Sequence, residues 1–551
     1  MAKLILFRPV AILYLLIATG TSAIAQQVPP NILLLVAEDM GPRVGAFGDP
    51  VAKTPTLDKL AQQSLRYPNT FTTAGVCAPS RAALITGVNQ VELGAQHMRT
   101  SSSPIGEYLA VPPPEVKAFP ELLRKAGYYT YITGKLDYQF SRYGANTGPL
   151  TIWDKEGVAL DWLPDKLSQP FFGMYHFGIT HESRTFDKHY NANLVKQKVQ
   201  DSTAQSEVKV PPYYPDTKIV RRDISRIYNN IQTMDFQVGK LLDQLESRGL
   251  SENTIVIWTT DHGDGLPRAK RELYDSGINV PLIVHTPKRY RSSMRSDIGV
   301  DNQLISFVDI APSILSMAEV PTPFYMDGKA RLTHSNAPKR EYIYAAKDRL
   351  DEHLFRERAV RSKQYKLIRN YLPNKPGAVR LSYREQQALM GELWRYMDEH
   401  AINPAPAIAH WFNARPEYEL YDVSIDPHEI NNLAAKPDYA NILRQMQGAL
   451  NDWQSRVLDK GLISESTLRQ EFWPGGKQPV TAAPTVSRTS GGAVALTSHT
   501  EGASLAYQFE GEDIWRVYTL PFTAPKNGKV LAKAVRYGYG PSEVVVVKAT
   551  R

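Results

Sequence analysis

The stretch that decides the fold is Asn31-Ile32-Leu33-Leu34-Leu35-Val36-Ala37, followed at once by Glu38-Asp39. A strand that is buried on both faces has such a continuous apolar run, because helices cover both sides of a parallel sheet. Carboxylates that follow a buried strand stand where α/β folds place ligand-binding groups. The stretch therefore predicts a parallel α/β sheet with an acidic site at its edge.

A second strand of the same kind follows a long helix. Residues 222–247 carry apolar side chains at helical spacing, and Gly249 lies just beyond them as a stop signal. Residues 254–260 form the next apolar run, which ends in Asp261-His262. Strand, helix and strand in alternation predict an α/β sandwich with a mostly parallel central sheet. We expect this large domain to span residues 28–340.

The pattern changes near residue 340. Short strands are expected at 359–369 and 418–422, and a helix at 383–400 lies between them. We therefore expect residues 341–474 to form a smaller α+β subdomain.

The last part of the chain is expected to be a separate β unit. Residues 475–492 are rich in Gly, Pro, Thr and Ser, which predicts a linker. Short apolar strands with turns between them follow over 504–547, and little helix is expected there. This spacing favours a small β-sandwich over residues 480–551.

Residues 1–25 have the pattern of a signal peptide. Lys3 and Arg8 supply the positive start, residues 10–18 the apolar run, and Ala23-Ile24-Ala25 the cleavage site. The run is too short for a transmembrane anchor, which is the alternative. We expect a secreted or periplasmic protein with no membrane span.

The charge of the chain says little about partners. The formal net charge of +8 would steer a polyanionic substrate, but an ordinary basic surface gives the same value. No cluster of Lys and Arg with interleaved aromatic residues occurs, so a nucleic-acid partner is not expected.

Cys77 is the single cysteine of the chain. An exported protein with one cysteine cannot close an internal disulfide, so Cys77 serves either packing or chemistry. It stands in the segment Gly75-Val76-Cys77-Ala78-Pro79-Ser80-Arg81-Ala82-Ala83-Leu84-Ile85-Thr86-Gly87. A buried cysteine at a helix start is the alternative to a reactive one.

The pentapeptide Cys-x-Pro-Ser-Arg, followed by an apolar helix and Thr-Gly, resembles the signature of the sulfatase family. The resemblance extends from about Asn31 to Leu433 and closes with Tyr421-Asp422 and Asp426-Pro427-His428-Glu429. It implies an alkaline-phosphatase-like sandwich and a separate maturation enzyme that oxidises Cys77 to formylglycine. The tail also looks like the small C-terminal sandwich of some β-hexosaminidases.

The resemblance implies a two-step reaction at residue 77. Hydrated formylglycine offers one hydroxyl that attacks the sulfur of a sulfate ester and releases the alcohol. The second hydroxyl then expels sulfate and restores the aldehyde.

Four residues at the two strand ends are the expected metal ligands: Glu38, Asp39, Asp261 and His262. Carboxylate oxygens suit a hard divalent ion, and the resemblance implies one Ca²⁺ per chain. The family has two Asp residues and then Asp-Asn, so each pair departs at one position. Because His suits calcium poorly, Mn²⁺ or Mg²⁺ stays open, as does a contact of His262 with the diol. Two helix-capping acidic pairs are the other interpretation.

The resemblance also assigns cations to the sulfate group. Arg81 would fix or polarise formylglycine, Lys135 of Gly-Lys-Leu-Asp would bind sulfate, and Lys270 would be the third cation. Asp137 replaces the usual histidine of the Gly-Lys-x-His segment. It is expected to bind a sugar hydroxyl or to pair with Lys135.

His181 is the expected general acid. Residues 171–182 resemble the strand that delivers this acid to the leaving oxygen, and an imidazolium can protonate a sugar alkoxide. His176, inside the same strand, is expected to be packing.

These variants together resemble bacterial glycan sulfatases related to heparan N-sulfatase. They imply hydrolysis of sulfate esters, or of an N-sulfate, on a sulfated polysaccharide or oligosaccharide. The alternatives are a phosphonate monoester or phosphodiester hydrolase of the same superfamily and a catalytically dead glycan-binding homologue.

Overall fold

The computed structural model describes residues 28–165, 167, 169–199, 201–292, 294, 297–333, 338–525 and 528–547. The expected signal peptide at 1–25 lies outside the described residues. Within them, no helix combines the length and the apolar character that crossing a membrane requires.

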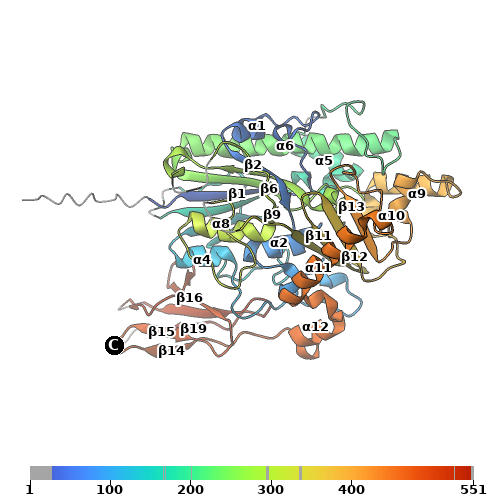
Figure 1. Ribbon diagram of the computed structural model, residues 1–551. Coiled ribbons are helices and arrows are strands. Elements are labelled where there is room, and N and C mark those ends of the chain that lie inside the picture. The colour runs from blue at the N-terminus through green and yellow to red at the C-terminus, as the bar shows by residue number, and fades with distance from the viewer. Residues whose placement is uncertain are drawn as a thin grey trace, which may run out of the picture.

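A large mixed sheet forms the centre of the molecule (Figure 1). The strand order is β4-β3-β5-β1-β6-β7-β2-β8, with β9 paired to β2. Every pairing is parallel except those of β7 with β6 and β2. The predicted mostly parallel α/β sheet is therefore confirmed. The strands are β1 (Asn31–Ala37), β2 (Leu65–Phe71), β3 (Tyr129–Thr133), β4 (Lys155–Val158), β5 (Phe171–Phe177), β6 (Thr254–Thr260), β7 (Asn279–His285), β8 (Gly299–Val300) and β9 (Ile305–Ser306).

Strand β1 is buried along its whole length because helices cover both faces of the sheet. Leu33 and Leu35 pack into one apolar core, whereas Leu34 and Val36 pack into the other. The first core includes the apolar face of the long helix α6 and α1 beside it, and the second lies under α2, α4 and α8 (Figure 1). The helices of this part are α1 (Pro55–Gln62), α2 (Cys77–Thr86), α3 (Gln90–Leu93), α4 (Phe119–Lys125), α5 (Asp187–Lys196), α6 (Lys218–Ser247), α7 (Asp275–Ile278) and α8 (Ile310–Met317).

A second sheet lies beside the carboxyl ends of the central strands (Figure 1). Its four antiparallel strands run in the order β10-β11-β12-β13, and helix α11 packs on it. The helix expected at 383–400 begins later, at Ala388, because residues 384–386 form a 3-10 turn. The elements are β10 (Ile343–Leu350), β11 (His353–Arg361), β12 (Tyr365–Asn370), β13 (Tyr418–Asp422), α9 (Ala388–Glu399), α10 (Pro406–Phe412), α11 (Ala440–Arg456) and α12 (Glu465–Phe472).

The end of the chain forms two small antiparallel sheets around a separate apolar cluster. They comprise β14 (Thr485–Arg488) with β15 (Val494–Thr497), and β16 (Ser504–Phe509), β17 (Arg516–Val517), β18 (Val530–Val535) and β19 (Val545–Val547). The linker expected at 475–492 is wrong over residues 485–488, which pair with β15 as strand β14. The Thr-Val-Ser-Arg alternation suits a strand, but its Gly- and Ser-rich surroundings hid it.

This terminal unit is joined to the central domain by buried hydrogen bonds. Ser504 Oγ and the Tyr537 hydroxyl donate to the two oxygens of Glu121 on α4, at 2.5 and 2.8 Å. Burial alone would raise the pKa of Glu121, but Lys125 and Lys117, together with hydrogen bonds from Ser504 and Thr151, lower it to about 2. The contact therefore holds a charged carboxylate that needs its partners in place.

Candidate functional site

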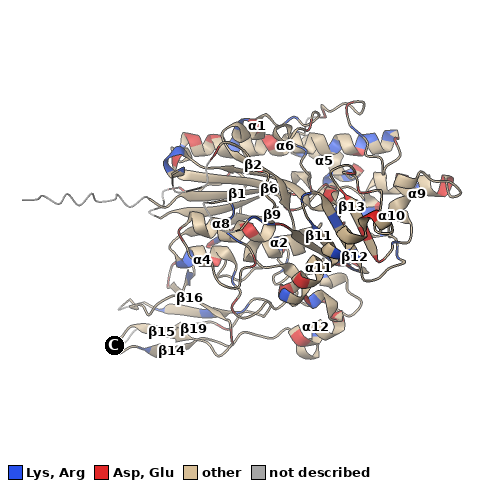
Figure 2. Ribbon diagram, viewed as in Figure 1, with Lys and Arg blue, Asp and Glu red and all other residues tan. Residues whose placement is uncertain are grey.

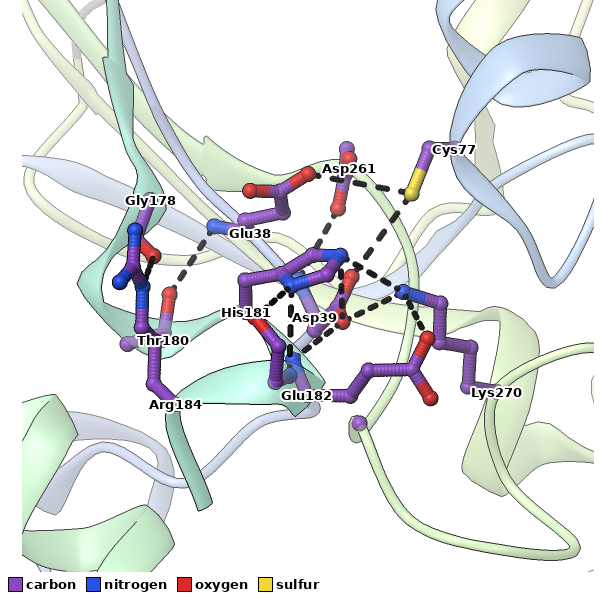
Figure 3. A network of polar contacts seen from close by, with 12 residues as sticks. Glu38, Asp39, Cys77, Gly178, Thr180, His181, Glu182, Arg184, Asp261 and Lys270 are labelled. Carbon is purple, nitrogen blue, oxygen red and sulfur yellow. Dashed lines mark hydrogen bonds and ion pairs between the residues drawn. The ribbon is translucent and has the colours of Figure 1, made fainter. Parts of the chain in front are cut away.

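The site forms where β1 and β6 end beside the start of α2 (Figure 3). The two strands are parallel neighbours with Ala37 opposite Thr260, so the residues after them emerge side by side. The Asp39 amide donates to Asp261 Oδ1 at 3.0 Å, and Ser80 Oγ on α2 donates to the Asp261 carbonyl at 2.6 Å. These contacts bring together the two strand ends and the cysteine-bearing helix.

Cys77 is the first residue of α2, and only 1% of its surface is exposed. Its sulfur lies 3.8 Å from Asp39 Oδ1, 3.9 Å from Glu38 Oε1 and 3.3 Å from His262 Nε2. A group at this position is thus placed between the two acidic residues that follow β1 (Figure 3).

Asp39 is fully buried and accepts hydrogen bonds from several donors. Lys270 Nζ lies 2.6 Å and the Glu182 amide 2.7 Å from Asp39 Oδ2, while His262 Nε2 lies 3.0 Å from Oδ1. Burial would raise the pKa of Asp39, but Lys270, His181 and His262 hold it well below its usual range. The side chain is therefore a carboxylate.

Glu38 points to a different set of cations. It pairs with Lys135 through Oε1 and lies 3.0 Å from His176 Nε2 through Oε2. Burial opposes ionisation, yet Lys135 and His176 lower the pKa of Glu38 well below normal. The adjacent acidic residues thus each hold one of the predicted sulfate-binding lysines.

The donors around Asp39 fit a divalent cation. One atom each from Asp39, Cys77, Asp261 and His262 lies within 4.8 Å of the others, and a second such group joins Glu38, Asp39 and His181. Asp261 Oδ2 is buried and has no hydrogen-bond partner among the described residues. His262 Nδ1 lies 3.0 Å from the Gly263 carbonyl, which leaves Nε2 facing the group. A buried carboxylate oxygen without a partner is what a cation would satisfy.

Arg81 is fully buried, and it hydrogen-bonds to the backbone at 135–136. Nε donates to the Leu136 carbonyl at 2.9 Å and Nη2 to the Lys135 carbonyl at 2.6 Å. It thereby fixes the backbone that carries Lys135, rather than hydrogen-bonding to residue 77 itself.

Asp137 takes up one of its two expected positions. Its Oδ2 lies 3.4 Å from Lys135 Nζ and 3.0 Å from Arg99 Nη2. Its backbone has a positive φ of 57°, which costs energy for a residue other than Gly.

Lys270 is held by the second sheet. Arg268 Nη2 donates to the carbonyls of His428 and Glu429, at 2.7 and 2.8 Å, and Lys366 Nζ donates to the Leu273 carbonyl at 2.9 Å. The ion pair of Lys347 with Glu272 adds a third connection. Residues 268–275 are therefore fixed from outside the central domain.

His181 lies at the more exposed side of the site, with 21% of its side chain accessible. Its Nδ1 is 2.8 Å from Ser183 Oγ, and its Nε2 is 3.4 Å from Lys270 Nζ. Burial and then Lys270 lower its pKa. The prediction that His181 ends the strand is wrong: β5 stops at Phe177, and a 3-10 turn (Gly178–Thr180) follows.

The sequence interpretation missed the role of His176, which contacts Glu38 instead of serving only as packing. The signal was the strand register, because His176 lies opposite Val36, two residues before Glu38 and on the same face. It also missed Glu182 and Arg271, which form a buried bidentate pair at 2.7 and 2.8 Å beside Lys270. The sequence spacing of those two residues does not predict this pair.

Comparison with known families decides the identity. The sulfatase family profile matches residues 30–155 and 157–320. The chain belongs to the sulfatase family. A profile described as "N-sulphoglucosamine sulphohydrolase, C-terminal" also matches residues 268–378 of this sulfatase.

Relatives agree with this assignment. An "Ulvan-active sulfatase" of Formosa agariphila is 38% identical, covering 96% of this chain and 94% of its own. Human N-sulphoglucosamine sulphohydrolase is 28% identical, covering 82% and 95%. A solved Bacteroides thetaiotaomicron structure from work on glycosaminoglycan metabolism shares the fold, with a TM-score of 0.57, 15% identity, and coverage of 78% and 97%. The chain is thus a sulfuric ester hydrolase by family.

Proposed function

We propose that this sulfatase removes sulfate from a sulfated polysaccharide or oligosaccharide, using formylglycine at residue 77 and one Ca²⁺. The observation that carries the proposal is the position of Cys77 between two buried carboxylates, each paired with a lysine. The named relatives support a glycan substrate, and cleavage of an N-sulfate is the nearest variant.

The protein groups would act on sulfate as follows. Formylglycine, as its hydrate, would supply the attacking hydroxyl, and a divalent ion would supply positive charge to the site. Lys135 and Lys270, both nearly fully buried, would hold the negative sulfate oxygens from two sides. Glu38, Asp39, Asp261 and His262 would hold the ion.

His181 would protonate the leaving oxygen. Its ring is oriented by Ser183 Oγ at 2.8 Å, which leaves Nε2 facing Lys270 and Asp39. A proton held at Nε2 is then positioned for a sugar alkoxide, which is a poor leaving group.

We further propose residues 28–340 as the catalytic domain, 341–474 as its subdomain and 480–551 as the terminal sandwich. Export by the signal peptide and oxidation by a maturation enzyme complete the proposal. Lys and Arg are interspersed with Asp and Glu over the elements seen in Figure 2.

The direct test measures sulfate release from a panel of sulfated glycans by wild type and Cys77→Ala, with an aryl sulfate and an aryl phosphodiester in parallel. We expect wild type to desulfate at least one glycan and to prefer the aryl sulfate, and Cys77→Ala to be inactive. Preference for the phosphodiester would favour the hydrolase alternative. Glycan binding with no hydrolysis of any substrate would favour the catalytically dead alternative.

A further inference from the structure

A polar cavity of about 430 Å³ lies next to the Lys135 side of the site. Its walls include Arg99, Asp137, Gln139, Arg142 and Tyr143. Asp137 connects the cavity to the site, because the same Oδ2 is 3.4 Å from Lys135 Nζ and 3.0 Å from Arg99 Nη2. A ligand that reaches Lys135 therefore has this cavity as its neighbour.

The backbone around the cavity is strained in three places. Arg99, Asp137 and Gln139 have φ values of 61°, 57° and 61°, in the left-handed region that residues other than Gly rarely adopt. Such conformations persist where the surrounding structure holds them and cluster at ligand-binding sites. Three in one cavity wall point to a built site.

Tyr143 gives the cavity an exposed aromatic face. Its side chain is 53% exposed. The Arg99 guanidinium lies 4.6 Å and Lys135 Nζ 5.4 Å from its ring centroid. Arg99 is itself 30% exposed, whereas Lys135 is 3% exposed. The exposed Tyr143 and the partly exposed Arg99 thus mark an open edge next to a closed catalytic centre.

The cavity wall is balanced in charge. Arg99 is paired with Asp137 at 3.0 Å, and Arg142 with Glu107 at 3.1 Å. A sugar hydroxyl can donate to a carboxylate and accept from the neighbouring guanidinium, so such pairs suit neutral hydroxyls. A carboxylate or sulfate on the ligand would face Asp137 and Glu107 as well as the two arginines, so the wall offers an anion no net attraction.

We propose that this cavity is a second sugar subsite, which takes an uncharged pyranose ring adjacent to the sulfated unit. The ring stacks on Tyr143, and its hydroxyls bind the Arg99–Asp137 pair and the polar side chains beside it. This deepens the proposed glycan function and rests on it. The subsite would make part of the affinity for an oligosaccharide independent of the sulfate group.

The test compares Tyr143→Ala with the ring-conserving Tyr143→Phe. We expect Tyr143→Ala to raise KM for a sulfated oligosaccharide about tenfold, since one aromatic contact is lost, and to raise KM for an aryl sulfate much less, since Lys135 keeps its ion pairs with Glu38 and Asp137. Tyr143→Phe should behave as wild type. Phe324→Ala, which removes another exposed aromatic ring, is the matched control and should change neither substrate.

Two further experiments distinguish failure of the sugar subsite from failure of the proposed sulfatase function. Isothermal titration with a desulfated neutral oligosaccharide should show binding to wild type that Tyr143→Ala weakens, whatever the enzyme hydrolyses. Oligosaccharides with a neutral neighbour should have a lower KM than matched ones with a uronate neighbour. Equal oligosaccharide KM and equal binding for wild type and Tyr143→Ala would overturn the subsite, and a preference for the uronate would overturn its neutral character. Absence of aryl-sulfate hydrolysis in wild type would instead overturn the proposed function.

Discussion

Two lysines flank Cys77, and different parts of the molecule hold them. Lys135 is fixed from within the central domain, because Arg81 on the Cys77 helix binds the carbonyls of Lys135 and Leu136. Lys270 belongs to a segment that the second sheet fixes through Arg268 and Lys366. One side of the site is therefore built locally, and the other depends on a distant part of the chain.

The two acidic residues between these lysines differ as well. Asp39 has Asp261, His262 and Cys77 within a group that fits a cation, whereas Glu38 is engaged by Lys135 and His176. Two residues that are neighbours in sequence thus serve different sides of one centre.

The largest loss of metal and activity is expected from substitutions on the Asp39 side of the site. Asp39→Ala and Asp261→Ala should each lose bound metal and essentially all activity, because each removes a charged oxygen ligand. Glu38→Ala should lose less metal than either. Elemental analysis of the purified variants measures this order, and stoichiometric calcium in both Asp variants would show that the ion binds elsewhere.

His181→Ala should follow, with an effect that depends on the leaving group. A sugar alcohol needs a proton in the transition state, whereas nitrophenolate leaves without one. We expect kcat/KM to fall about 10²–10⁴-fold on a sulfated sugar and far less on an aryl sulfate. Equal losses on the two substrates would assign His181 to sulfate binding or structure and make Asp137 the next candidate acid.

A smaller effect is expected from loosening the support of Lys270. Arg268→Lys keeps the charge but loses the paired bonds to the 428–429 carbonyls, so kcat/KM should fall about tenfold as Lys270 shifts. Arg358→Lys is the matched control, since Arg358 is a buried arginine of strand β11 in the second sheet that pairs with Asp348 and Asp459. It should lower the melting temperature without changing kcat/KM of the folded enzyme. If the two variants lose equal activity, Lys270 does not depend on this support.

The smallest effect concerns the pH dependence of stability. Glu429 is buried between Lys366 and the Asp275 amide, and burial is the main cause that raises its pKa from 4.5 to about 7. The folded protein then binds a proton that the unfolded chain releases, so stability is full below pH 4.5 and falls as pH rises through 7. Glu429→Gln should remove this decline, which is at most about 3 kcal/mol. Unfolding by urea at several pH values measures it, and an unchanged slope in the variant would contradict the assignment.

Much of the central domain could be predicted because β1 and β6 are continuous apolar runs with carboxylates at their ends. The same reasoning anticipated that Glu38, Asp39, Asp261 and His262 would meet, since parallel neighbours end at one edge of a sheet, whereas the place of Cys77 beside them followed from the sulfatase resemblance. The second sheet was predicted as a unit, but its support of Lys270 was not. That support consists of the Lys366 side chain of β12 and of the 428–429 carbonyls that accept from Arg268, and no period in the sequence encodes such contacts.

Local patterns also failed where two signals competed. His176 lies in an apolar strand, which favoured packing, yet its register with Val36 places it beside Glu38. The strand Thr485–Arg488 was hidden by the turn-forming residues around it. The pairing of Glu182 with Arg271 depends on a close approach of two loops, which only the folded chain reveals.

The central claim is that residue 77 of the active enzyme is formylglycine. Mass spectrometry of the tryptic peptide Tyr67–Arg81 from preparations of different specific activity tests it most directly. We expect a peptide in which the sulfur and two hydrogens of Cys77 are replaced by one oxygen. The fraction of this modified peptide should rise in proportion to sulfatase activity. Full activity from a preparation that contains only the unmodified thiol would contradict it.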